Sequence, residues 1–520
     1  MSSSHFAHAP DAKPALVFNT GATLDYGTLD HRANQAAHLF RSLGLQRGDG
    51  VAILMENQPQ FAVLVTAASR AGLYFCCIST QLAVAEAAYI LQDCQAKLLL
   101  TSQMKKELAA QVAAGAGPRY KFIAGGALEG FRSWDEALAA QPGTPIADES
   151  EGQDLLYSSG TTGRPKGVKA ALTEPGQPSP IARLTELNVR NYGFDACTVY
   201  LSPGPLYHAA PLRWLLVTLR LGATAVVMES FDAERALALI AQHKVSHSQW
   251  VPTMFVRMLR LPEPARRAHD LSSMRCAVHA AAPCPVDVKR AMIAWWGPVL
   301  WEYYAGTESN GATVISSAEW LAHPGSVGRA AMGRIHVLGD DGQELPPRNI
   351  GAIYFSGGPE FEYLNDPEKT RSVHDAHGRS TIGDIGWQDE EGFLYLTDRQ
   401  SNMIISGGVN IYPQEIEGVL VSHPAVQDVA VIGVPNAEYG EEVKALVQLV
   451  DPSRASSELG QELIAHCRAR IAGLKCPRSL SFVTELPRHA NGKLVKRLLP
   501  AELRAGPGEI RARQQNSAQA

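Results

Sequence analysis

The most constraining feature of the sequence is an alternation of short apolar runs with amphipathic stretches. Val51–Met55 is apolar and strand-like, Phe61–Arg70 has helical periodicity, and Tyr74–Cys77 is a second apolar run. The same pattern returns around a helix predicted at Ala233–Gln242. Strands separated by helices pair in parallel, and the helices cover the faces of the sheet. The sequence therefore predicts an α/β fold with layers of parallel sheet.

The pattern changes after about residue 392. Short alternating runs, Val426–Val434 and Val443–Leu449, precede a helix predicted at Glu462–Ile471. This change predicts a small α+β domain after a large α/β domain, with a boundary near Asp398–Asn402. We assign residues 1–398 to the N-terminal domain and 399–505 to a C-terminal domain. Residues 506–520 are polar and aperiodic, which predicts a flexible tail.

Composition excludes several classes of protein. A chain of 520 residues with 45% hydrophobic residues can bury large cores in more than one domain. The formal charge of −5 argues against a nucleic-acid-binding protein. The sequence shows neither a signal peptide nor a run of about 18 apolar residues that could span a membrane, so we expect a cytoplasmic protein. The eight cysteines lack zinc-ligand spacing, which predicts reduced, mostly buried thiols.

A loop rich in small residues follows the strand-like Asp154–Tyr157. Its sequence, from Ser158 to Gly167, is SSGTTGRPKG. Glycines let backbone N–H groups converge on an anion, hydroxyls add donors, and Lys166 adds a positive charge. Since no Ser or Thr follows the lysine, the loop differs from the common GxxxxGK[ST] phosphate loop. The residue types predict a phosphate-binding loop of another kind, the alternative being a surface turn.

The loop closely resembles the phosphate motif of the adenylate-forming (ANL) superfamily, which includes acyl-CoA synthetases, peptide-synthetase adenylation domains and beetle luciferases. Further segments resemble the family's motifs and occur in the family's order: Pro205–Pro211, Trp301–Glu308, Thr381–Gly386 and Leu486–Lys493. Together they cover the chain from about residue 20 to 500. The resemblance implies the ANL fold, with a large N-terminal domain and a small domain that rotates, and it implies ATP, Mg²⁺ and coenzyme A as cofactors.

The chemistry implied is the in-line attack of a carboxylate on the α-phosphate of ATP, which requires positive charge and N–H donors around the phosphates. By resemblance, Thr307 contacts the α-phosphate and Glu308 binds Mg²⁺, a hard cation that suits one carboxylate plus phosphate oxygens. The residues implied for the remaining phosphates are Ser158, Thr161, Thr162, Gly163 and Lys166.

The nucleoside contacts are also implied by the resemblance. Tyr304 is expected to stack on adenine, and Asp384 to accept hydrogen bonds from both ribose hydroxyls, as a carboxylate can. Arg399 resembles the second ribose contact, with an interdomain ion pair as the alternative. The other wall of the adenine site is expected to consist of Ala281, Ala282 and Pro283.

Two reactions in one cleft require two surfaces of the small domain. The resemblance implies that Lys493 bridges the carboxylate and the α-phosphate during adenylation. It then leaves, and Gly407 and Gly408 border the pantetheine tunnel, although a β-turn explains this glycine pair equally well. Ser401 occupies the hinge position, where the family commonly has Asp or Lys. Other cations near Lys493 are candidates to meet the phosphates of CoA.

The acid site is implied by the histidine motif. His208 is expected beside the reacting carboxylate, with a buried structural histidine as the alternative. The absence of Asp from Tyr207–Pro211 disfavours an amino acid substrate. The particular residues found in these motifs favour a bulky hydrophobic acid. It could be a medium- or long-chain fatty acid, a bile or steroid side-chain acid, or an aryl acid. The residues that either line this pocket or belong to the core are Tyr207, Trp214, Trp250 and Tyr303.

The sequence thus predicts an ATP-dependent, AMP-forming carboxylic acid–CoA ligase. Its expected partners are the acid, ATP and CoA, without nucleic acid or a membrane span, and a homodimer is left open. One alternative is an acyl-AMP ligase that loads a separate carrier protein, because little sequence remains after Lys493 for a carrier domain. A binding-only protein is disfavoured because every charged residue of the expected site is present.

Overall fold

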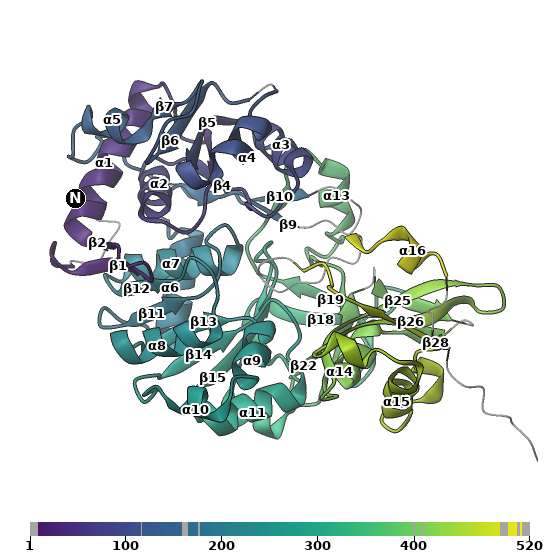
Figure 1. Ribbon diagram of the computed structural model, residues 1–520. Helices are drawn as coiled ribbons and strands as arrows, with labels where there is room; N and C mark the ends of the chain where they lie inside the picture. Colours follow the sequence, from purple (N-terminus) through teal and green to yellow (C-terminus); the bar gives the residue numbers. More distant parts are fainter. Residues whose placement is uncertain are drawn as a thin grey trace, which may run out of the picture.

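The protein is described by a computed structural model that covers residues 9–115, 117–158, 165–174, 177–399, 402–406, 409–488, 498–506 and 510–511. Figure 1 shows two sheet layers in the N-terminal domain, one above the other, with the C-terminal domain to their right. The predicted α/β class with parallel sheets and a separate α+β domain is confirmed.

The first layer is a six-stranded sheet with the order β7-β6-β5-β3-β4-β8, in which all neighbours are parallel. Its strands are β3 (Gly50–Leu54), β4 (Tyr74–Cys77), β5 (Ala96–Ser102), β6 (Tyr120–Ala124), β7 (Arg132–Ser133) and β8 (Gln153–Asp154). Its helices are α1 (Tyr26–Ser42), α2 (Pro59–Arg70), α3 (Val84–Asp93), α4 (Lys106–Val112) and α5 (Trp134–Ala139). The predicted strand–helix–strand unit is present as β3, α2 and β4. Helix α2 begins two residues earlier than predicted, because Pro59 suits a first helical turn.

The second layer is a nine-stranded sheet with the order β17-β16-β15-β14-β13-β11-β12-β1-β2. The neighbours from β15 to β1 are parallel, and antiparallel strands form both edges. The strands are β1 (Pro14–Phe18), β2 (Thr23–Asp25), β11 (Val199–Ser202), β12 (Thr224–Val227), β13 (His247–Trp250), β14 (Cys276–His279), β15 (Leu300–Ala305), β16 (Ala312–Ser316) and β17 (Arg329–Met332). The helices are α6 (Pro180–Tyr192), α7 (Ala209–Arg220), α8 (Ala233–His243), α9 (Pro252–Leu259), α10 (Glu263–Arg267), α11 (Val286–Trp296) and α12 (Ser317–Ala322).

The two layers share one apolar core. Buried side chains of α2, such as Phe61, and of α7, such as Leu212, join it between the sheets, where Figure 1 shows α7. A second cluster packs α8, α9 and α11 on the outer face of the nine-stranded sheet. A third packs α3 and α4 on the outer face of the six-stranded sheet. The order helix, sheet, helix, sheet, helix buries both faces of each sheet, as parallel strands require.

Smaller sheets complete the N-terminal domain. One has the order β20-β10-β9 and the other β18-β19-β21-β22, and both are antiparallel. The elements are β9 (Leu156–Ser158), β10 (Lys166–Lys169), β18 (Arg334–Leu338), β19 (Gly351–Ser356), β20 (Glu362–Tyr363), α13 (Pro367–Ser372), β21 (Asp384–Gln388) and β22 (Leu394–Arg399). The last strand ends at the predicted domain boundary.

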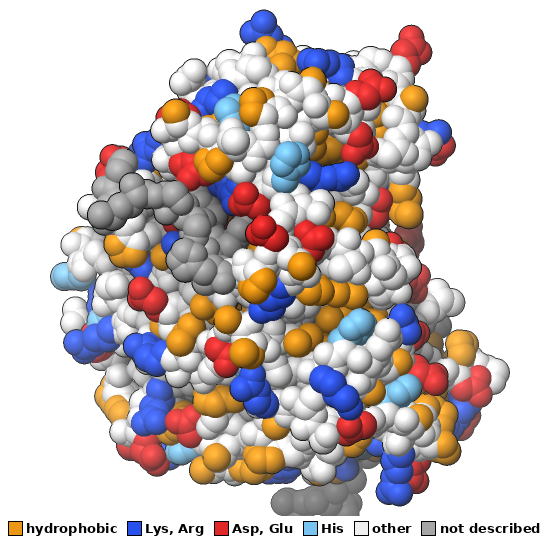
Figure 2. Space-filling model, turned by 90° about the vertical axis from the view of Figure 1, so that its left-hand side faces the viewer, with side chains coloured by type: hydrophobic (Ala, Val, Ile, Leu, Met, Phe, Trp, Pro, Cys, Tyr) orange, Lys and Arg blue, Asp and Glu red, His pale blue; other side chains and the backbone are white. Residues whose placement is uncertain are grey.

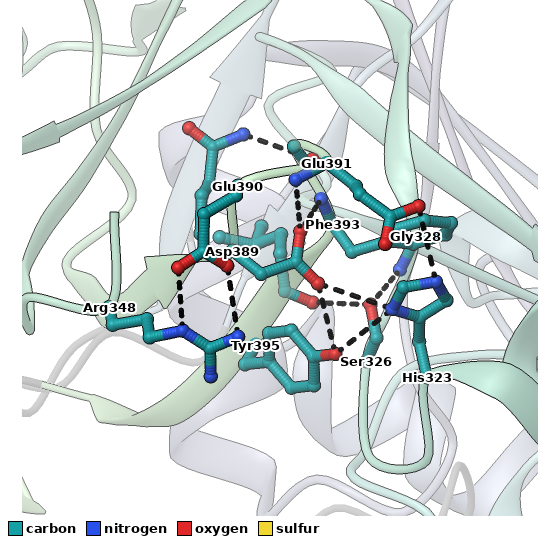
Figure 3. Close-up of polar contacts among 12 residues, drawn as sticks. His323, Ser326, Gly328, Arg348, Asp389, Glu390, Glu391, Phe393 and Tyr395 are labelled. Carbon is teal, nitrogen blue, oxygen red and sulfur yellow. Dashed lines mark hydrogen bonds and ion pairs between the residues drawn. The ribbon is translucent and has the colours of Figure 1, made fainter. Parts of the chain in front are cut away.

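Figure 3 shows the turn that joins β21 to β22. Asp389 closes it: one carboxylate oxygen accepts the backbone N–H of Phe393 at 2.9 Å, and the other accepts the hydroxyl of Tyr395 at 3.2 Å. His323 lies 3.2 Å from the same carboxylate, and its ring stacks on Phe393 at 3.8 Å. These contacts hold one end of the hairpin rigidly. The opposite end carries Asp384.

The C-terminal domain contains a mixed sheet with the order β24-β23-β26-β27-β28, and β25 also pairs with β26. Its elements are β23 (Ile404–Ser406), β24 (Val409–Ile411), α14 (Pro413–Val421), β25 (Val426–Asn436), β26 (Gly440–Leu449), α15 (Ser457–Arg468), β27 (Ser479–Val483), α16 (Ala501–Arg504) and β28 (Ile510–Arg511). The helix predicted at Glu462–Ile471 is α15, which begins earlier because the Ser456 hydroxyl accepts the N–H of Leu459.

The C-terminal segment and the distribution of charged side chains can be compared with the sequence predictions. Strand β28 pairs with β27, so Ile510–Arg511 are ordered within the segment predicted to be a flexible tail, while residues 507–509 and 512–520 lie outside the described residues. Figure 2 shows Lys, Arg, Asp and Glu side chains interspersed over one face, without a broad field of one sign.

The remaining composition predictions concern cysteines and membrane spans. All eight cysteines lie in the described part of the chain and are free thiols; six are buried, Cys284 is half-buried and Cys197 is exposed. The predicted burial of most of the cysteines is confirmed. Among the described helices, none has both the length and the apolar character needed to cross a bilayer.

His247 is a buried histidine within the nine-stranded sheet. His247 on β13 lies 2.9 Å from the carbonyl oxygen of Tyr192 and 2.9 Å from the hydroxyl of Ser246. Its ring packs on Phe194 at 4.3 Å between centroids. Burial lowers the pKa of His247 from 6.5 to about 4, so the folded protein keeps this side chain neutral.

This histidine predicts a pH-dependent stability. Between pH 6.5 and about 4 the unfolded chain binds a proton at His247 that the folded chain does not bind. The free energy of unfolding therefore falls as the pH falls, by about 1.4 kcal/mol per pH unit for this group. The denaturation midpoints of the wild type and of His247→Gln should be measured at pH 7 and pH 5. The variant should lose less stability on acidification; equal losses would contradict the assignment.

Candidate active site

A cavity of about 780 Å³ lies where four neighbouring parallel strands end. These strands, β11, β13, β14 and β15, run in the same direction, so the segments that follow them converge at one edge of the sheet. Ligands of open parallel sheets bind at this edge. Predicted site residues that are far apart in the sequence meet on the cavity wall: Ser158, Lys166, Tyr207, His208, Trp214, Trp250, Ala281, Tyr303, Thr307 and Glu308.

His208 stands where the segment after β11 enters helix α7. Its backbone is extended, and its ring meets that of Tyr207 edge-on at 4.8 Å. The amino end of a helix carries partial positive charge, which favours a carboxylate nearby. The position is therefore compatible with the role predicted for His208.

The aromatic residues predicted to line an acid pocket differ in their packing. Trp214 and Tyr303 stack at 6.1 Å with an interplanar angle of 22° and border the cavity. Burial raises the pKa of Tyr303 to about 12, so its hydroxyl stays protonated and the side chain is neutral. Trp250 also borders the cavity but is completely buried, with its ring packed against Phe255 and Trp296. Trp250 thus serves the core as well as the cavity wall.

A second cavity of about 1480 Å³ adjoins the first, since Ala281 and Tyr303 line both. It lies between the two domains, because residues of α14 and β25 also line it. The predicted adenine and ribose residues on its wall are Ala281, Ala282, Pro283, Tyr304 and Asp384. Ala281 has a φ of +74°, which is strained for a residue other than glycine and makes a tight turn after β14.

The ribose side of this cavity is organised by a hydrogen bond. The Tyr304 hydroxyl donates to Asp384 at 2.6 Å, so β15 and β21 are joined at the site. Across the hairpin, Asp384 pairs with Arg399 in the strand register. The Arg399 backbone therefore lies opposite Asp384, whereas the Arg399 side chain is outside the described residues.

The phosphate side of the first cavity is built around Tyr363 of β20. Its hydroxyl donates to Glu308 at 2.9 Å, and its ring lies 5.7 Å from the ammonium of Lys166. Partial burial lowers the pKa of Lys166, and the positive charge of Lys369 lowers it further. Lys166 and Ser158 face each other in the β9–β10 register, so the two ends of the predicted phosphate loop are adjacent.

Other predicted site residues lie outside the described residues. They are Thr161, Thr162, Gly163, Ser401, Gly407, Gly408 and Lys493.

The described residues contain no cluster of three or more His, Cys, Asp or Glu that could hold a metal ion. Glu308 contributes one carboxylate at the cavity wall. One carboxylate completed by phosphate oxygens and water is a donor set that suits Mg²⁺. The residues present therefore fit a metal that arrives with the nucleotide.

An arginine that sequence analysis did not select connects these segments. Arg213 on α7 forms a salt bridge with Asp154 at 2.8 Å and donates to the Ser309 hydroxyl at 2.9 Å. It also donates to the carbonyl oxygen of Thr307 at 3.2 Å. Ser309 has a φ of +55°, so the turn after Thr307 is strained and depends on such support. Gln153 donates to Asp154 at 2.8 Å and orients the carboxylate.

Arg213 thus joins α7 to the strand before the phosphate loop and to the Thr307 turn. In the sequence, Arg213 stands out only as the single cation in the apolar stretch 209–219. A lone charge on an otherwise apolar helix requires a partner when buried. Which partner it has could not be read from the sequence, because Asp154 and Ser309 lie 59 and 96 residues away.

Comparisons with known proteins identify the family. Residues 4–360 match the AMP-binding enzyme family, and residues 415–493 match the AMP-binding enzyme C-terminal domain. The chain belongs to the AMP-binding enzyme family. This confirms the resemblance to adenylate-forming enzymes that the motifs predicted.

Similar proteins match over nearly the whole chain. A long-chain-fatty-acid–CoA ligase of Mycobacterium tuberculosis is 33% identical over 92% of this chain and 93% of its own. A feruloyl-CoA synthase of Amycolatopsis sp is 34% identical over 92% of this chain and 94% of its own. The crystal structure of ATP-bound MatB from Rhodopseudomonas palustris has a TM-score of 0.82 and 30% identity, and covers 96% of this chain and 97% of that one. The predicted ANL fold is therefore confirmed.

Replacing Arg213 should slow adenylate formation. Arg213→Met removes the donors that hold the Thr307 turn, so we expect pyrophosphate release to fall about tenfold or more, since hydrogen bonds to charged groups are worth about 1.5–3 kcal/mol. Arg220→Met is a matched control, because Arg220 also lies on α7 and pairs with Glu151 at 2.8 Å. A folded Arg213→Met protein with unchanged pyrophosphate release, or an equal loss in the control, would contradict this role.

Proposed function

We propose that this protein is an ATP-dependent, AMP-forming carboxylic acid–CoA ligase. It activates its acid as an acyl-adenylate and then transfers the acyl group to coenzyme A. The observation that carries the proposal is the contact of two cavities at one sheet edge, one bearing Thr307 and Glu308 and the other Tyr304 and Asp384. Similar proteins that match 92% of the chain bear the names of CoA ligases, which supports this activity.

In the first step the nucleotide binds across both cavities. Adenine lies between Tyr304 and the Ala281–Pro283 turn, and the carboxylate of Asp384, oriented by the Tyr304 hydroxyl, accepts from the ribose hydroxyls. Lys166 and Thr307 face the phosphates. Mg²⁺, when bound with ATP at Glu308, neutralises charge on the phosphate oxygens.

The acid enters the first cavity with its carboxylate toward His208 and the amino end of α7. The surrounding wall excludes water and holds the carboxylate in line with the α-phosphate, which is the main requirement of this reaction. Lys493 supplies positive charge to the transition state in this proposal.

In the second step the C-terminal domain presents another surface to the cleft. Its present contacts with the N-terminal domain include the Arg260 guanidinium, which donates to the carbonyl oxygen of Val426 at 2.8 Å. Backbone contacts of this kind can be exchanged without loss of a buried core. Rotation about the segment at Ser401 would withdraw Lys493 and bring Gly407 and Gly408 to the pantetheine path.

The acid is a bulky hydrophobic carboxylate in this proposal. The first cavity has room for such a group and is bordered by Trp214, Tyr303 and Val314. Relatives named for a long-chain fatty acid and for ferulate are consistent with a bulky acid of either an aliphatic or an aromatic kind.

The activity is tested by AMP release from ATP and Mg²⁺ over a panel of fatty, aryl and steroid side-chain acids, with and without CoA. We expect AMP release that depends on CoA, with a thioester identified by mass spectrometry. Pyrophosphate release with retained adenylate, and no thioester for any acid, would favour the acyl-AMP ligase that loads a carrier protein. No ATP turnover with any acid would contradict both activities.

The ribose contact provides a sharper test of the nucleotide site. Asp384→Asn keeps the size of the side chain but removes the charged acceptor, so the KM for ATP should rise about tenfold. The wild type should prefer ATP to 2′- and 3′-deoxy-ATP, and the variant should lose this preference. Asp148→Asn serves as the control, because Asp148 is exposed and pairs with Arg41. A preference that persists in Asp384→Asn would show that another residue reads the ribose.

A further inference from the structure

Lys369 is a cation on the wall of the first cavity that no step of the proposed reaction uses. It lies on α13, whereas Lys166 is the first residue of β10, and both line the cavity together with Glu308. Partial burial lowers the pKa of Lys166, and the positive charge of Lys369 lowers it further, so the two ammonium groups are close enough to repel. Asp366 and Glu308 act on Lys166 in the opposite direction. Two ammonium groups from segments far apart in the sequence therefore face the same region of the cavity.

Hydrogen bonds fix the backbone that carries Lys369. The backbone N–H of Tyr363 on β20 donates to the Thr370 hydroxyl at 2.9 Å, and this hydroxyl donates to the carbonyl oxygen of Asp366 at 3.0 Å. The Asp366 carboxylate accepts the backbone N–H of Lys369 at 2.9 Å. Because the Tyr363 hydroxyl also donates to Glu308, one strand holds both Glu308 and the start of α13 in place.

The turn before α13 is anchored to the six-stranded layer. Asn365 has a φ of +57°, and its amide donates to the carbonyl oxygen and to the carboxylate of Asp93, each at 3.1 Å. Asp93 also accepts the hydroxyl of Tyr157 at 2.6 Å, and Tyr157 lines the first cavity. The segment that carries Lys369 is thus held on two sides before any ligand arrives, which lowers the entropy cost of binding an anion there.

Neither Lys166 nor Lys369 forms a salt bridge within the described part of the chain. By contrast, the other lysine of β10, Lys169, pairs with Glu362 at 3.4 Å. An ammonium group has three N–H donors, and a partly buried one is stabilised by acceptors. An anion between the two lysines would supply acceptors to both and offset their repulsion.

The other charges on the cavity wall leave this region available to an anion. Asp154 is paired with Arg213 at 2.8 Å, so this pair adds no net charge. Arg183 and Glu360 also line the cavity, but both are exposed, and water and salt screen their charges. Glu308 is the remaining carboxylate of the wall. In the proposed function it binds Mg²⁺, which reverses the local charge.

Polyphosphate is the anion that suits this region. Thr307 and Glu308, the residues expected at the α-phosphate and at Mg²⁺, share the wall of the first cavity with Lys369. The expected adenine and ribose residues, Tyr304 and Asp384, line the second cavity. A nucleotide that lies across both cavities therefore has its base and ribose away from Lys369 and its phosphates toward it. Lysine binds phosphate oxygens as a compact positive charge.

We propose that Lys369 acts together with Lys166 as a second lysine for the β- and γ-phosphates of ATP, and that it binds the pyrophosphate as it leaves. As a carboxylate oxygen of the acid bonds to the α-phosphorus, the bond from this phosphorus to the bridging oxygen breaks, and its electron pair leaves with pyrophosphate. The two ammonium groups stabilise the charge that pyrophosphate gains. The inference rests on the proposed ligase activity and adds a residue to its nucleotide site.

Nucleotide affinity tests this role without turnover. The Kd values of the full-length protein for ATP, AMP and inorganic pyrophosphate should be measured by calorimetry with Mg²⁺, in the absence of acid and CoA. In Lys369→Met we expect the affinities for ATP and pyrophosphate to fall about tenfold, as the loss of a hydrogen bond to a charged group predicts. The affinity for AMP should not change, because AMP lacks the phosphates that Lys369 contacts.

Arg371→Met is the matched control. Arg371 is an exposed cation on the same helix, and it is not among the described residues that line the first cavity. Its replacement removes one positive charge from α13 and should leave all three affinities unchanged. An equal loss of ATP affinity in Arg371→Met and Lys369→Met would indicate a general effect of charge and would overturn the contact.

The outcomes distinguish this inference from the activity on which it rests. A Lys369→Met protein that binds ATP as tightly as the wild type, or that loses AMP affinity to the same extent as ATP affinity, overturns the role of Lys369 and leaves the ligase activity standing. A wild-type protein that binds neither ATP nor AMP overturns the proposed activity, and the role of Lys369 with it.

Discussion

The site depends on one constraint, the parallel pairing of β11, β13, β14 and β15. Parallel strands end at the same edge, so the four segments that follow them must meet there. The pairing is possible only because both faces of the sheet are covered. The shared core of α2 and α7 covers one face, and α8, α9 and α11 cover the other.

Polar contacts then give this edge a defined geometry. Arg213 holds the Thr307 turn, Tyr363 holds Glu308, and Tyr304 holds Asp384. Each is a contact between elements distant in sequence, and each restrains a residue expected to meet the nucleotide. Electrostatic catalysis depends on donors and charges that are in place before the reaction, and such contacts reduce the reorganisation that it requires.

The position of the second cavity bears on the two reactions proposed for this chain. It lies between the nucleotide wall of the N-terminal domain and the C-terminal domain, so the groups that face the nucleotide depend on the orientation of the smaller domain. The hairpin β21–β22 leads directly to this boundary. Its far turn is held by Asp389, and its near end carries Asp384. A rigid hairpin at this boundary would keep Asp384 in place during the proposed rotation of the C-terminal domain.

The sequence alone determined the fold class, the family and the chemical identity of the expected site. Periodicity predicts β3, α2 and β4 because helices and strands bury residues at different spacings, and the motifs are local strings such as Trp301–Glu308. Helix ends were less well predicted: α15 begins at Ser457 because of a single serine cap. Only the tertiary structure decided which side chains meet. The salt bridge of Arg213 with Asp154, and the packing of Tyr192 on Trp214, join residues 59 and 22 positions apart. Such contacts follow from how layers pack, and packing is not encoded in any local pattern.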